Sequence, residues 1–562
     1  MDSLDPQVSY ELSKLDPDVP FRATKAHLHH TWAKTFYSQP ELYIQPESVA
    51  EIQKVVNLAR KCRRRLVTVG SGHSPSDLTC TSSWIVNLDN FRRILSFSRE
   101  TGVVTVESGI RLWQLGDELE KCGLMLPNLG SIDSQSIAGV ISTGTHGSSL
   151  RFGLLSDSVQ ALSIALANGQ VVRCSKTNNP SLFRAALLSL GALGIITEIT
   201  IQAVPTFNIA WKQTLKSLPQ VLENGTLGYG RARNTFGFGG CLILSVLSFG
   251  APTKPICHFG NHVQLSMVAD WAMQFITICC TCPITFQEYY PGSNGSFSAC
   301  NMASNLENTW QKRLNLAELG PQAISRLSAW LNGDAKAANI PFSHKGLWVH
   351  CPIEVRVSDT SKSETPRPYL EQTNKTGPTL YLNATLYRPH LRDPPCTARY
   401  YEAFEWLMRD LGGRPHWAKN FGENLGPADF QEMYGADLNE WLRVRNEADP
   451  HGMFLGEWHR RTLLPAQHAV SNSSEFPLAE REKSRRKIGK WGSGDGVEWV
   501  GDKSWSHPNA QLDKPGEGEK FEAASPSPLA TATSEESFDY LAHGEASIMG
   551  SSNPNGQDSS NF

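Results

Sequence analysis

The amino-acid sequence predicts an α+β protein with two folded domains and a C-terminal tail that lacks a core. Between Tyr43 and Pro205, short apolar runs alternate with amphipathic helix patterns, which is typical of a mixed domain. Strand and helix patterns return after about residue 320 and end near Pro465. Residues 466–562 are rich in Ser, Gly, Pro and Glu, so this tail is expected to be largely disordered.

The first domain is expected to span residues 37–207, after a lead-in helix and loop at residues 1–36. Apolar residues at helical spacing predict helices at 49–60, 112–122 and 181–190. Short apolar runs predict strands at 66–69, 84–88, 103–106, 161–166 and 170–174. Asn168-Gly169 between the last two strands is a strong hairpin signal.

The second domain is expected to span residues 208–465. Its clearest elements are strands at 347–357 and 379–387, then helices at 400–411 and 427–434 and a further helix through Trp441. Residues 225–255 are Gly-rich and apolar and give no clear element.

Composition limits the class of protein and the kinds of partner. The chain has 562 residues, of which 40% are hydrophobic and 19% are charged, and its formal net charge is −3. This length is ample for two domains. Because no strong positive charge is present to attract a phosphate backbone, nucleic acid is not an expected partner.

Cysteine usage and the N-terminal segment indicate an intracellular protein with reduced, mostly buried thiols. Twelve cysteines are scattered without regular spacing. The one cluster, Cys279, Cys280 and Cys282, has no second ligand pair, so no metal site is expected. The N-terminal MDSLDPQVSYELSKLD is acidic and lacks an apolar core, which fits neither a secretory signal nor a transit peptide.

The most apolar stretch, residues 265–282, is short for a membrane-spanning helix and contains Asp270 and Gln274. A charge near the middle of such a helix costs about 2.5–3.5 kcal/mol on insertion. A buried or interfacial helix is therefore the favoured interpretation, with a peripheral membrane contact as the alternative.

Three segments rich in small residues predict a binding site for a large planar cofactor in the first domain. Gly70-Ser71-Gly72-His73-Ser74 directly follows a predicted strand, where glycines let backbone N–H groups approach a pyrophosphate. Residues 129–147 combine Gly, Ser and Thr at high density, and residues 191–197 place Gly194 before an apolar strand. Each segment alone is weak evidence, because a Gly-rich turn can be purely structural. Three in order within one domain are hard to explain by packing.

Two motifs in the second domain supply charges suited to a polyhydroxylated substrate. Glu354 and Arg356 are two residues apart on a predicted inner strand, so they share a face. A carboxylate and a guanidinium together can accept from and donate to sugar hydroxyls. Such a pair is more often a surface ion pair of little energetic value. Lys419, in Arg414-Pro-His416-Trp417-Ala-Lys419, is a candidate cation for stabilising developing negative charge, whereas Trp417 can be a packing anchor.

With these motifs the sequence resembles the vanillyl-alcohol oxidase family, and within it the fungal aldonolactone oxidases, over roughly residues 20–210 and 320–465. The resemblance implies an FAD-binding domain of the PCMH type and a substrate domain with an antiparallel sheet and helices. It implies that the cofactor is FAD, bonded covalently through His73. The residues implied to line it are Gly70, Ser71, Gly72, His73, Ser74, Gly130, Ser131, Ser136, Gly139, Ser142, Gly144, His146 and Ile196. The resemblance also implies catalytic roles for Glu354, Arg356 and Lys419, and a mainly structural role for the closing segment at residues 449–459.

The activity implied is oxidation of a sugar 1,4-lactone at its 2-hydroxyl, with D-arabinono-1,4-lactone as the expected substrate. Dioxygen is the expected acceptor, and hydrogen peroxide and a dehydro-lactone of the erythroascorbate type are the expected products. By resemblance alone, the location is expected to be a mitochondrial membrane surface.

Two alternatives stay open at this stage. One is a dehydrogenase that passes electrons to a cytochrome or quinone, which differs by oxygen access near residues such as Ala138. The other is a flavin-binding module without catalysis, because residues 212–319 lack the aromatic, basic strand that the family carries there. The preferred lactone, the identity of the base and the oligomeric state are left undetermined.

Overall fold

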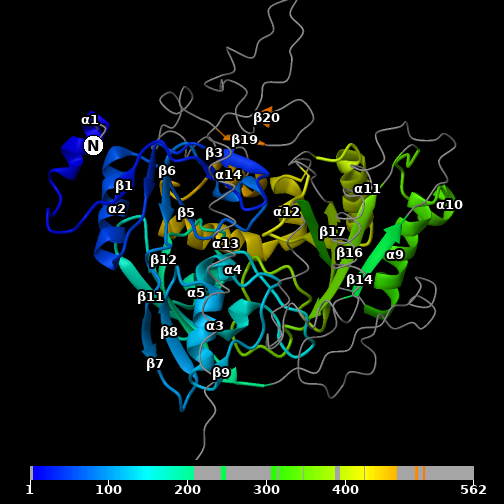
Figure 1. Ribbon diagram of the computed structural model, residues 1–562, viewed down its shortest axis with the longest axis horizontal. Coiled ribbons are helices and arrows are strands. Elements are labelled where there is room, and N and C mark those ends of the chain that lie inside the picture. Colours follow the sequence, from blue (N-terminus) through cyan, green and yellow to red (C-terminus); the bar gives the residue numbers. More distant parts are fainter. Residues whose placement is uncertain are drawn as a thin grey trace, which may run out of the picture. The chain divides into compact units, whose positions relative to one another are not determined.

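The computed structural model describes residues 4–207, 316–345, 347, 349–386, 393–422 and 425–464, and the backbones of strands at 242–247, 306–312, 488–490 and 498–499 (Figure 1). The expectations for residues 265–282 and for the cysteine cluster lie outside the described residues. So does most of the segment 212–319 and of the predicted tail.

The first domain begins with a four-stranded sheet in the order β1(Ala23–Thr24), β4(Leu42–Ile44), β6(Trp84–Asn87) and β5(Leu66–Val69). Strands β4, β6 and β5 run parallel, so the chain must cross over between β4 and β5, and helix α2(Val49–Cys62) makes this crossover. Of the predicted apolar stripe on α2, Ile52, Val55, Val56 and Ala59 are buried and Val49, at the start of the helix, is partly buried, which confirms the predicted helix.

A second, antiparallel sheet completes this domain. Its order is β11(Val171–Ser175), β10(Val159–Ala165), β12(Ile195–Gln202), β8(Val103–Glu107) and β7(Ile94–Phe97). Helices α3(Leu112–Glu120), α4(Ile137–Ser142) and α5(Pro180–Ala186), the short helices η1(Asp77–Thr79) and η2(Leu155–Ser158), and the pair β9(Leu124–Met125) and β13(Val204–Pro205) lie between these strands in the sequence. The predicted hairpin is confirmed, since β10 pairs with β11 and Gly169 has a φ of 85°.

The second domain is built on a five-stranded antiparallel sheet (Figure 1). Its order is β14(Leu242–Leu247), β16(His350–Ser358), β17(Thr379–Leu386), β15(Leu306–Lys312) and β18(Gly413–Pro415). Helices α9(Leu316–Leu331), α10(Ala335–Ala338) and α11(Thr397–Asp410) accompany it. The predicted inner position of the strand that carries Glu354 is confirmed, because β16 has a neighbour on each side.

The last part of the predicted second domain packs on the first domain. It contains α12(Pro427–Tyr434), α13(Ala436–Ala448) and α14(Glu457–Leu463). Met453 accepts a hydrogen bond from the Leu66 N–H at 2.9 Å, and Met453 and Phe454 belong to the same buried cluster as α2. A stretch near the end of the predicted second domain therefore helps to form the core of the first.

The N-terminal residues also contribute to these layers. Helix α1(Pro6–Leu12) buries Val8 in the α2 cluster, and β1 extends the parallel sheet. Strands β2(His29–His30) and β3(Phe36–Ser38) form a second small sheet with β19(Ile488–Lys490) and β20(Glu498–Trp499) from the predicted tail.

Two local expectations differ from the structure. The helix predicted at 181–190 ends at Ala186, because Leu190 and Gly191 adopt positive φ angles of 54° and 75° that no α-helix can contain. The small-residue stretch 129–147, for which no helix was predicted, includes the helix α4. Both differences fall where the chain turns around the site described below.

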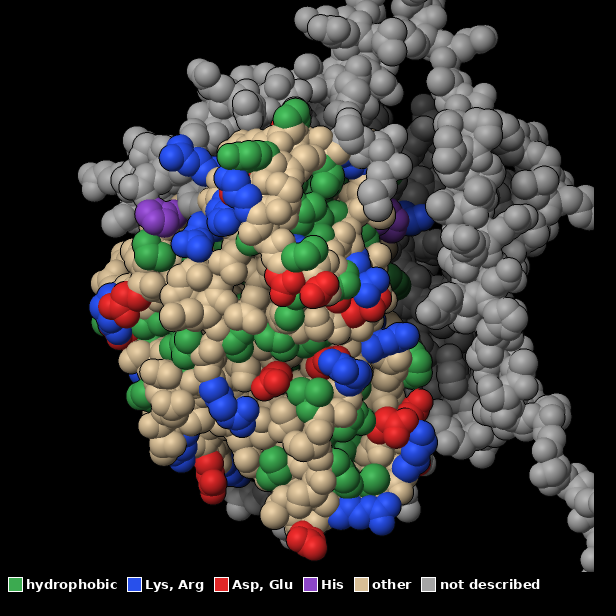
Figure 2. Space-filling model, turned by 90° about the vertical axis from the view of Figure 1, so that its left-hand side faces the viewer, with side chains coloured by type: hydrophobic (Ala, Val, Ile, Leu, Met, Phe, Trp, Pro, Cys, Tyr) green, Lys and Arg blue, Asp and Glu red, His purple; other side chains and the backbone are tan. Residues whose placement is uncertain are grey.

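The distribution of charged side chains and the burial of the described cysteines agree with what the composition indicates. On the face shown in Figure 2, acidic and basic side chains are interspersed. The described cysteines, Cys62, Cys80, Cys122, Cys174 and Cys396, are all unbridged, and all but Cys122 are buried, as predicted. Among the described helices none has the length and apolar character needed to cross a bilayer.

Candidate active site

A groove in the first domain brings the three predicted small-residue segments together, and we call it the first-domain groove. Nine of the residues expected to line a cofactor border it: Gly70, Ser71, Gly72, His73, Ser74, Ser136, Gly139, Ser142 and Ile196. They come from the turn after β5, from α4 and its preceding residue, and from the start of β12. The groove is also bordered by the turn that replaces the predicted end of α5, at Ser189, Leu190 and Gly191.

Glycine is required at two positions of the turn after β5. A Cβ on Gly70 would stand 1.9 Å from the Ser136 hydroxyl oxygen, so any side chain here would separate the turn from α4. Gly72 has a φ of 67°, in the left-handed region that favours glycine. The GSGHS pattern therefore reflects close packing at the groove as well as conformational freedom.

His73 lies at the groove with one ring nitrogen bonded and the other without a partner. Its Nε2 lies 3.0 Å from the Ser134 hydroxyl, and its Nδ1 is buried with no hydrogen-bond partner among the described residues. Burial lowers the pKa of His73 to about 4, and the nearby charges of Arg111 and Lys419 lower it further. The imidazole is therefore neutral at physiological pH.

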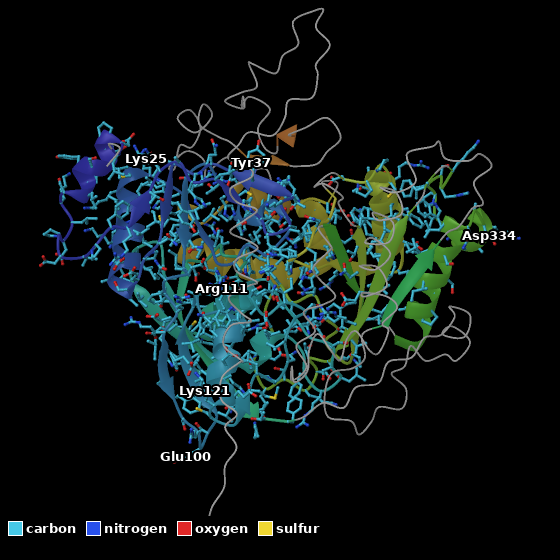
Figure 3. All side chains as sticks on the ribbon, in the orientation of Figure 1. Lys25, Tyr37, Glu100, Arg111, Lys121 and Asp334 are labelled. Carbon is cyan, nitrogen blue, oxygen red and sulfur yellow. The ribbon has the colours of Figure 1, made fainter. Side chains whose placement is uncertain are left out.

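Two residues that border the groove, and one arginine near its Gly70 turn, were not anticipated from the sequence. Ser108 and Gln135 border the groove, and each has a buried side-chain oxygen without a partner among the described residues. Arg111, labelled inside the first domain in Figure 3, contacts Asp89 at 2.5 Å and places Nη1 3.9 Å from a Cβ built on Gly70. Their spacing follows neither helix nor strand periodicity, so no sequence signal could have selected them.

Phe454 and His459 border the same groove from the closing segment, for which the sequence predicted a mainly structural role. His459 donates from Nε2 to the Leu190 carbonyl at 2.8 Å and accepts the Gly456 N–H at Nδ1 at 3.0 Å. Burial lowers the pKa of His459 to about 4, so the ring is neutral and held in one tautomer. This histidine thus fixes the Leu190 turn that borders the groove.

The other four residues expected to line the cofactor do not border the described groove. Gly130 and Ser131 lie in the loop that precedes α4, and a Cβ on Gly130 would stand 3.0 Å from the Thr145 side chain. Gly144, with a φ of 69°, lies against Gln372 of the second domain. His146 stacks on Tyr381 of β17, with ring centroids 3.5 Å apart.

Glu354 and Arg356 form a hydrogen-bonded ion pair on the inner strand β16. Arg356 donates to Glu354 Oε1 from Nε at 2.8 Å and from Nη2 at 2.5 Å, and both side chains are 14% exposed. Asn383, opposite Glu354 on β17, donates to Glu354 Oε2 at 3.3 Å. The two side chains are largely buried and Glu354 accepts three hydrogen bonds. The pair is therefore pre-organised and is not a surface ion pair.

The segment that follows His146 ties this pair to the first domain. Ser149 donates its N–H to the Val357 carbonyl at 2.9 Å, and Val357 donates its N–H to the Ser148 hydroxyl at 3.4 Å. His146 is therefore held beside β16, and Arg356 is one of the charges that depress its pKa after burial itself. The Gly147 carbonyl accepts from His146 Nδ1 at 2.8 Å, so the proton of the neutral ring is on Nδ1.

The charge of Lys419 acts on both groups of residues. Its charge is among the causes that lower the pKa values of both His73 and His146. Burial lowers the pKa of Lys419 itself to about 8. The preceding His416 accepts the Ala418 N–H at Nδ1 at 3.0 Å, and its carbonyl accepts the Lys419 N–H at 3.0 Å, which makes a tight turn. The structure thus brings Glu354, Arg356 and Lys419 to one region, with His146 among them.

Trp417 anchors this turn through packing and a hydrogen bond. It is fully buried, donates from Nε1 to the Leu370 carbonyl at 2.8 Å, and stacks on Phe430 of α12 with ring centroids 5.1 Å apart. Its role is to anchor the loop that carries Lys419, as the packing interpretation of this tryptophan predicts.

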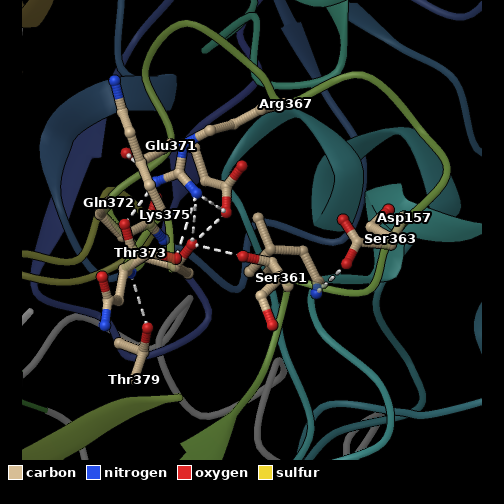
Figure 4. A network of polar contacts seen from close by, with 12 residues as sticks. Asp157, Ser361, Ser363, Arg367, Glu371, Gln372, Thr373, Lys375 and Thr379 are labelled. Atoms are coloured by element: carbon tan, nitrogen blue, oxygen red, sulfur yellow. Dashed lines mark hydrogen bonds and ion pairs between the residues drawn. The ribbon is translucent and has the colours of Figure 1, made fainter. Parts of the chain in front are cut away.

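A polar network joins the two domains beside the site (Figure 4). Thr365 of the second domain donates to the Asp157 carbonyl of the first at 2.6 Å, and Arg184 of α5 donates to the Arg367 carbonyl at 2.8 Å. Arg367 also pairs with the buried Glu371 at 3.1 Å. Burial raises the pKa values of both Asp157 and Glu371, so each carboxyl retains its proton to a higher pH than usual.

Comparison with known families matches each domain separately. Residues 40–175 match the family described as FAD binding domain, and residues 313–462 match the family described as D-arabinono-1,4-lactone oxidase. The first match lies within the domain that carries the groove. The second contains Glu354, Arg356 and Lys419.

Relatives match over most of their length. A Neurospora crassa protein provisionally named D-arabinono-1,4-lactone oxidase is 44% identical over 551 residues, which cover 88% of this chain and 96% of the relative. The D-arabinono-1,4-lactone oxidase of Yarrowia lipolytica is 34% identical over 528 residues, covering 77% and 96%. The L-gulonolactone oxidase of Bos taurus is 31% identical over 450 residues, covering 76% and 96%.

Solved structures share the fold at low identity. Cholesterol oxidase from B. sterolicum aligns with a TM-score of 0.57 at 15% identity, covering 80% of this chain and 99% of that one. Xylooligosaccharide oxidase from Myceliophthora thermophila C1 aligns with a TM-score of 0.53 at 16% identity, covering 82% and 99%. These likenesses confirm the predicted two-domain α+β fold of the vanillyl-alcohol oxidase type. Together with the relatives, they show that the chain belongs to the aldonolactone oxidase family.

Proposed function

We propose that this chain is an FAD-dependent oxidase of sugar 1,4-lactones, with D-arabinono-1,4-lactone as the substrate. The observation that carries the proposal is the largely buried, hydrogen-bonded Glu354–Arg356 pair, in a chain whose first domain has a groove lined by small residues and suited to a large cofactor. The reaction removes two hydrogens from the carbon and oxygen of the 2-hydroxyl group. Dioxygen takes them up as hydrogen peroxide, and the lactone leaves as an enediol of the erythroascorbate type.

The residues of the first-domain groove fit FAD. Buried oxygens of Ser108 and Gln135, which have no partner among the described residues, are positioned to bond a polar ligand, and the Gly70 turn leaves room that a Cβ would fill. Arg111 supplies a cation at that turn for an anionic part of the cofactor. When bound, FAD supplies the two-electron acceptor that amino-acid side chains cannot provide.

His73 is the residue proposed to bond FAD covalently. Its ring is neutral and its Nδ1 lone pair is not used by any described residue, which are the properties a nucleophilic nitrogen needs. The linkage predicts that flavin colour stays with the protein after acid precipitation, and that His73→Ala releases it.

Toward the substrate, the ion pair and the lysine have separate roles. Arg356 and Glu354 donate to and accept from the hydroxyls of the lactone, and their mutual bonds fix the direction in which they do so. Lys419 supplies positive charge between the groove and the ion pair, where negative charge develops as hydride leaves the substrate. His146, with its proton on Nδ1, presents Nε2 as a hydrogen-bond acceptor in the same region.

The proposal is tested by anaerobic mixing of the purified protein with D-arabinono-1,4-lactone while the flavin absorbance is followed, and by then admitting air. Bleaching followed by rapid recovery is the expected result. Bleaching without recovery in air would establish a dehydrogenase instead. The absence of bleaching with arabinono-, gulono- and galactono-lactones alike would reject lactone oxidation.

Attachment to a mitochondrial membrane surface stays a prediction that rests on the family resemblance. It is tested by fractionating cells that produce the full chain and washing the mitochondrial membranes with high salt. Recovery of the protein in the soluble fraction before any wash would contradict it.

A further inference from the structure

The loop that precedes α4 holds a serine against the histidine that is proposed to carry FAD. Ser134 Oγ lies 3.0 Å from His73 Nε2. The loop on either side of this serine is fixed by backbone bonds to the start of α3, since Leu112 donates to the Gln135 carbonyl at 2.9 Å and Trp113 donates to the Asp133 carbonyl at 3.0 Å. The hydroxyl is therefore presented from a rigid backbone rather than from a free loop.

The histidine is held on its other sides as well. The Gly72 carbonyl accepts the Trp32 N–H at 2.8 Å, and the Trp32 ring lies with its centroid 5.1 Å from that of His73. The imidazole thus has little freedom to rotate, and the one hydrogen bond to its ring comes from Ser134 within the described residues.

The geometry selects one tautomer of this ring. The buried Nδ1 has no hydrogen-bond partner among the described residues, so a proton placed there would be a buried N–H group with no acceptor among them, which is unfavourable. A proton on Nε2 is instead accepted by the Ser134 hydroxyl. Which ring nitrogen carries the proton is set by the bond that the other makes, so the lone pair is left on Nδ1.

We propose that Ser134 is a positioning residue for covalent flavin attachment: it holds the His73 proton on Nε2 and leaves Nδ1 as the nucleophile. This inference rests on the proposed covalent link to FAD. In the step, a C–H bond of the flavin 8α-methyl group breaks and a bond from Nδ1 to that carbon forms. The imidazole proton leaves from Nε2 through the Ser134 hydroxyl. One dioxygen takes up the two electrons and two protons and becomes hydrogen peroxide, so the step balances.

The test compares the full-length wild type with Ser134→Ala and Ser134→Thr. Each protein is purified, incubated with FAD in air, and precipitated with acid at intervals to measure the fraction of flavin that stays bound. Ser134→Ala is expected to attach flavin about two- to tenfold more slowly, the effect of losing one well-placed hydrogen bond. Ser134→Thr retains the hydroxyl and is expected to attach flavin at close to the wild-type rate.

Total flavin in the protein before precipitation, and the thermal midpoint, are measured for every variant. Equal attachment rates in Ser134→Ala and the wild type would overturn the inference, and so would equal slowing in the alanine and threonine variants, which would indicate packing. If the wild type itself holds FAD without any acid-stable link, the covalent proposal for His73 fails instead. His73→Ala gives the baseline of flavin that is bound without a link.

Discussion

At the scale of single residues, charge and burial decide what the site can do. Lys419 is a buried cation whose pKa is lowered to about 8, so it is protonated at pH 7 and loses its proton just above. Glu354 and Arg356 hold each other in place on an inner strand. Two predictions separate the contribution of the lysine from that of the pair.

Lys419→Met is expected to slow flavin reduction by the lactone about 10²–10³-fold at pH 7, because a pre-organised charge near the reacting atoms is lost. In the wild type the rate is expected to fall as pH rises through about 8, where Lys419 deprotonates, and Lys419→Arg is expected to move this fall to higher pH. Anaerobic stopped-flow across the pH range measures both. The matched control is Lys336→Met, on the exposed side of α10. An unchanged rate in Lys419→Met would remove this residue from the mechanism.

Glu354→Gln retains the shape of the side chain but removes the charge that pairs with Arg356. Lactone affinity is expected to fall about 10- to 100-fold, since hydrogen bonds to a charged group contribute about 1.5–3 kcal/mol. The concentration dependence of flavin bleaching gives the affinity, with Glu402→Gln on the exposed face of α11 as the control. Wild-type affinity in Glu354→Gln would leave the pair with a structural role alone.

At the scale of elements, the closing segment shows how a turn is fixed by one buried ion pair. Arg445 and Asp449 are both fully buried and lie 3.0 Å apart. The Asp449 carboxylate also accepts the N–H groups of Met453 and Phe454, each at 2.9 Å. This arrangement caps α13 and delivers Phe454 to the groove.

Asp449→Ala is therefore expected to lower the free energy of unfolding by about 3–5 kcal/mol, since removing one partner leaves a buried, unpaired charge. Denaturant titration measures the loss. Glu447→Gln, which removes a partner of Arg443 on the exposed side of the same helix, is expected to produce no measurable change. Equal stability of Asp449→Ala and wild type would mean that the turn does not depend on the carboxylate.

At the scale of the whole molecule, the contact between the domains contains Asp157, a buried carboxyl whose pKa is raised. Burial raises the pKa of Asp157, the neighbouring Glu371 raises it further, and Arg367 and a hydrogen bond from Leu154 oppose this. A raised pKa in the folded state means that the stability contributed by Asp157 is fully present below its unfolded pKa. That stability is lost as pH rises through the folded pKa.

Asp157→Asn is expected to match the wild type in stability at pH 4 and to be more stable at pH 8, because the amide cannot ionise. The stability advantage of Asp157→Asn over the wild type is expected to grow as the pH rises from 4 to 8. Thermal unfolding at both pH values measures it. The control is Asp359→Asn. Asp359 lies in the second domain, and its carboxylate accepts a hydrogen bond from the Ser361 hydroxyl. Parallel pH profiles for Asp157→Asn and wild type would contradict the argument.

How much of this structure the sequence predicts depends on whether a feature is determined by residues close together in the chain or by residues far apart. The stripe on α2 and the shared face of Glu354 and Arg356 follow from local periodicity, and both are confirmed. The predicted length of α5 was wrong, because the chain turns at Leu190 and the helix cannot continue to that residue. His459, far away in the sequence, fixes this turn by a hydrogen bond to the Leu190 carbonyl. Arg111, Ser108 and Gln135 could not be selected because no local pattern marks them.

The sequence by itself determined the α+β class, the order of the main elements, the small-residue turns and the charged motifs, because these depend on residues close together in the chain. Only the tertiary structure decided that His146 lies with Arg356 and Lys419 rather than on the described first-domain groove, and that residues 453–459 complete the core and groove of the first domain. It also decided that Ser134 meets His73. The reason is physical: these contacts join segments separated by tens to hundreds of residues. Their partners are chosen by which buried surfaces and hydrogen-bonding groups can be satisfied together.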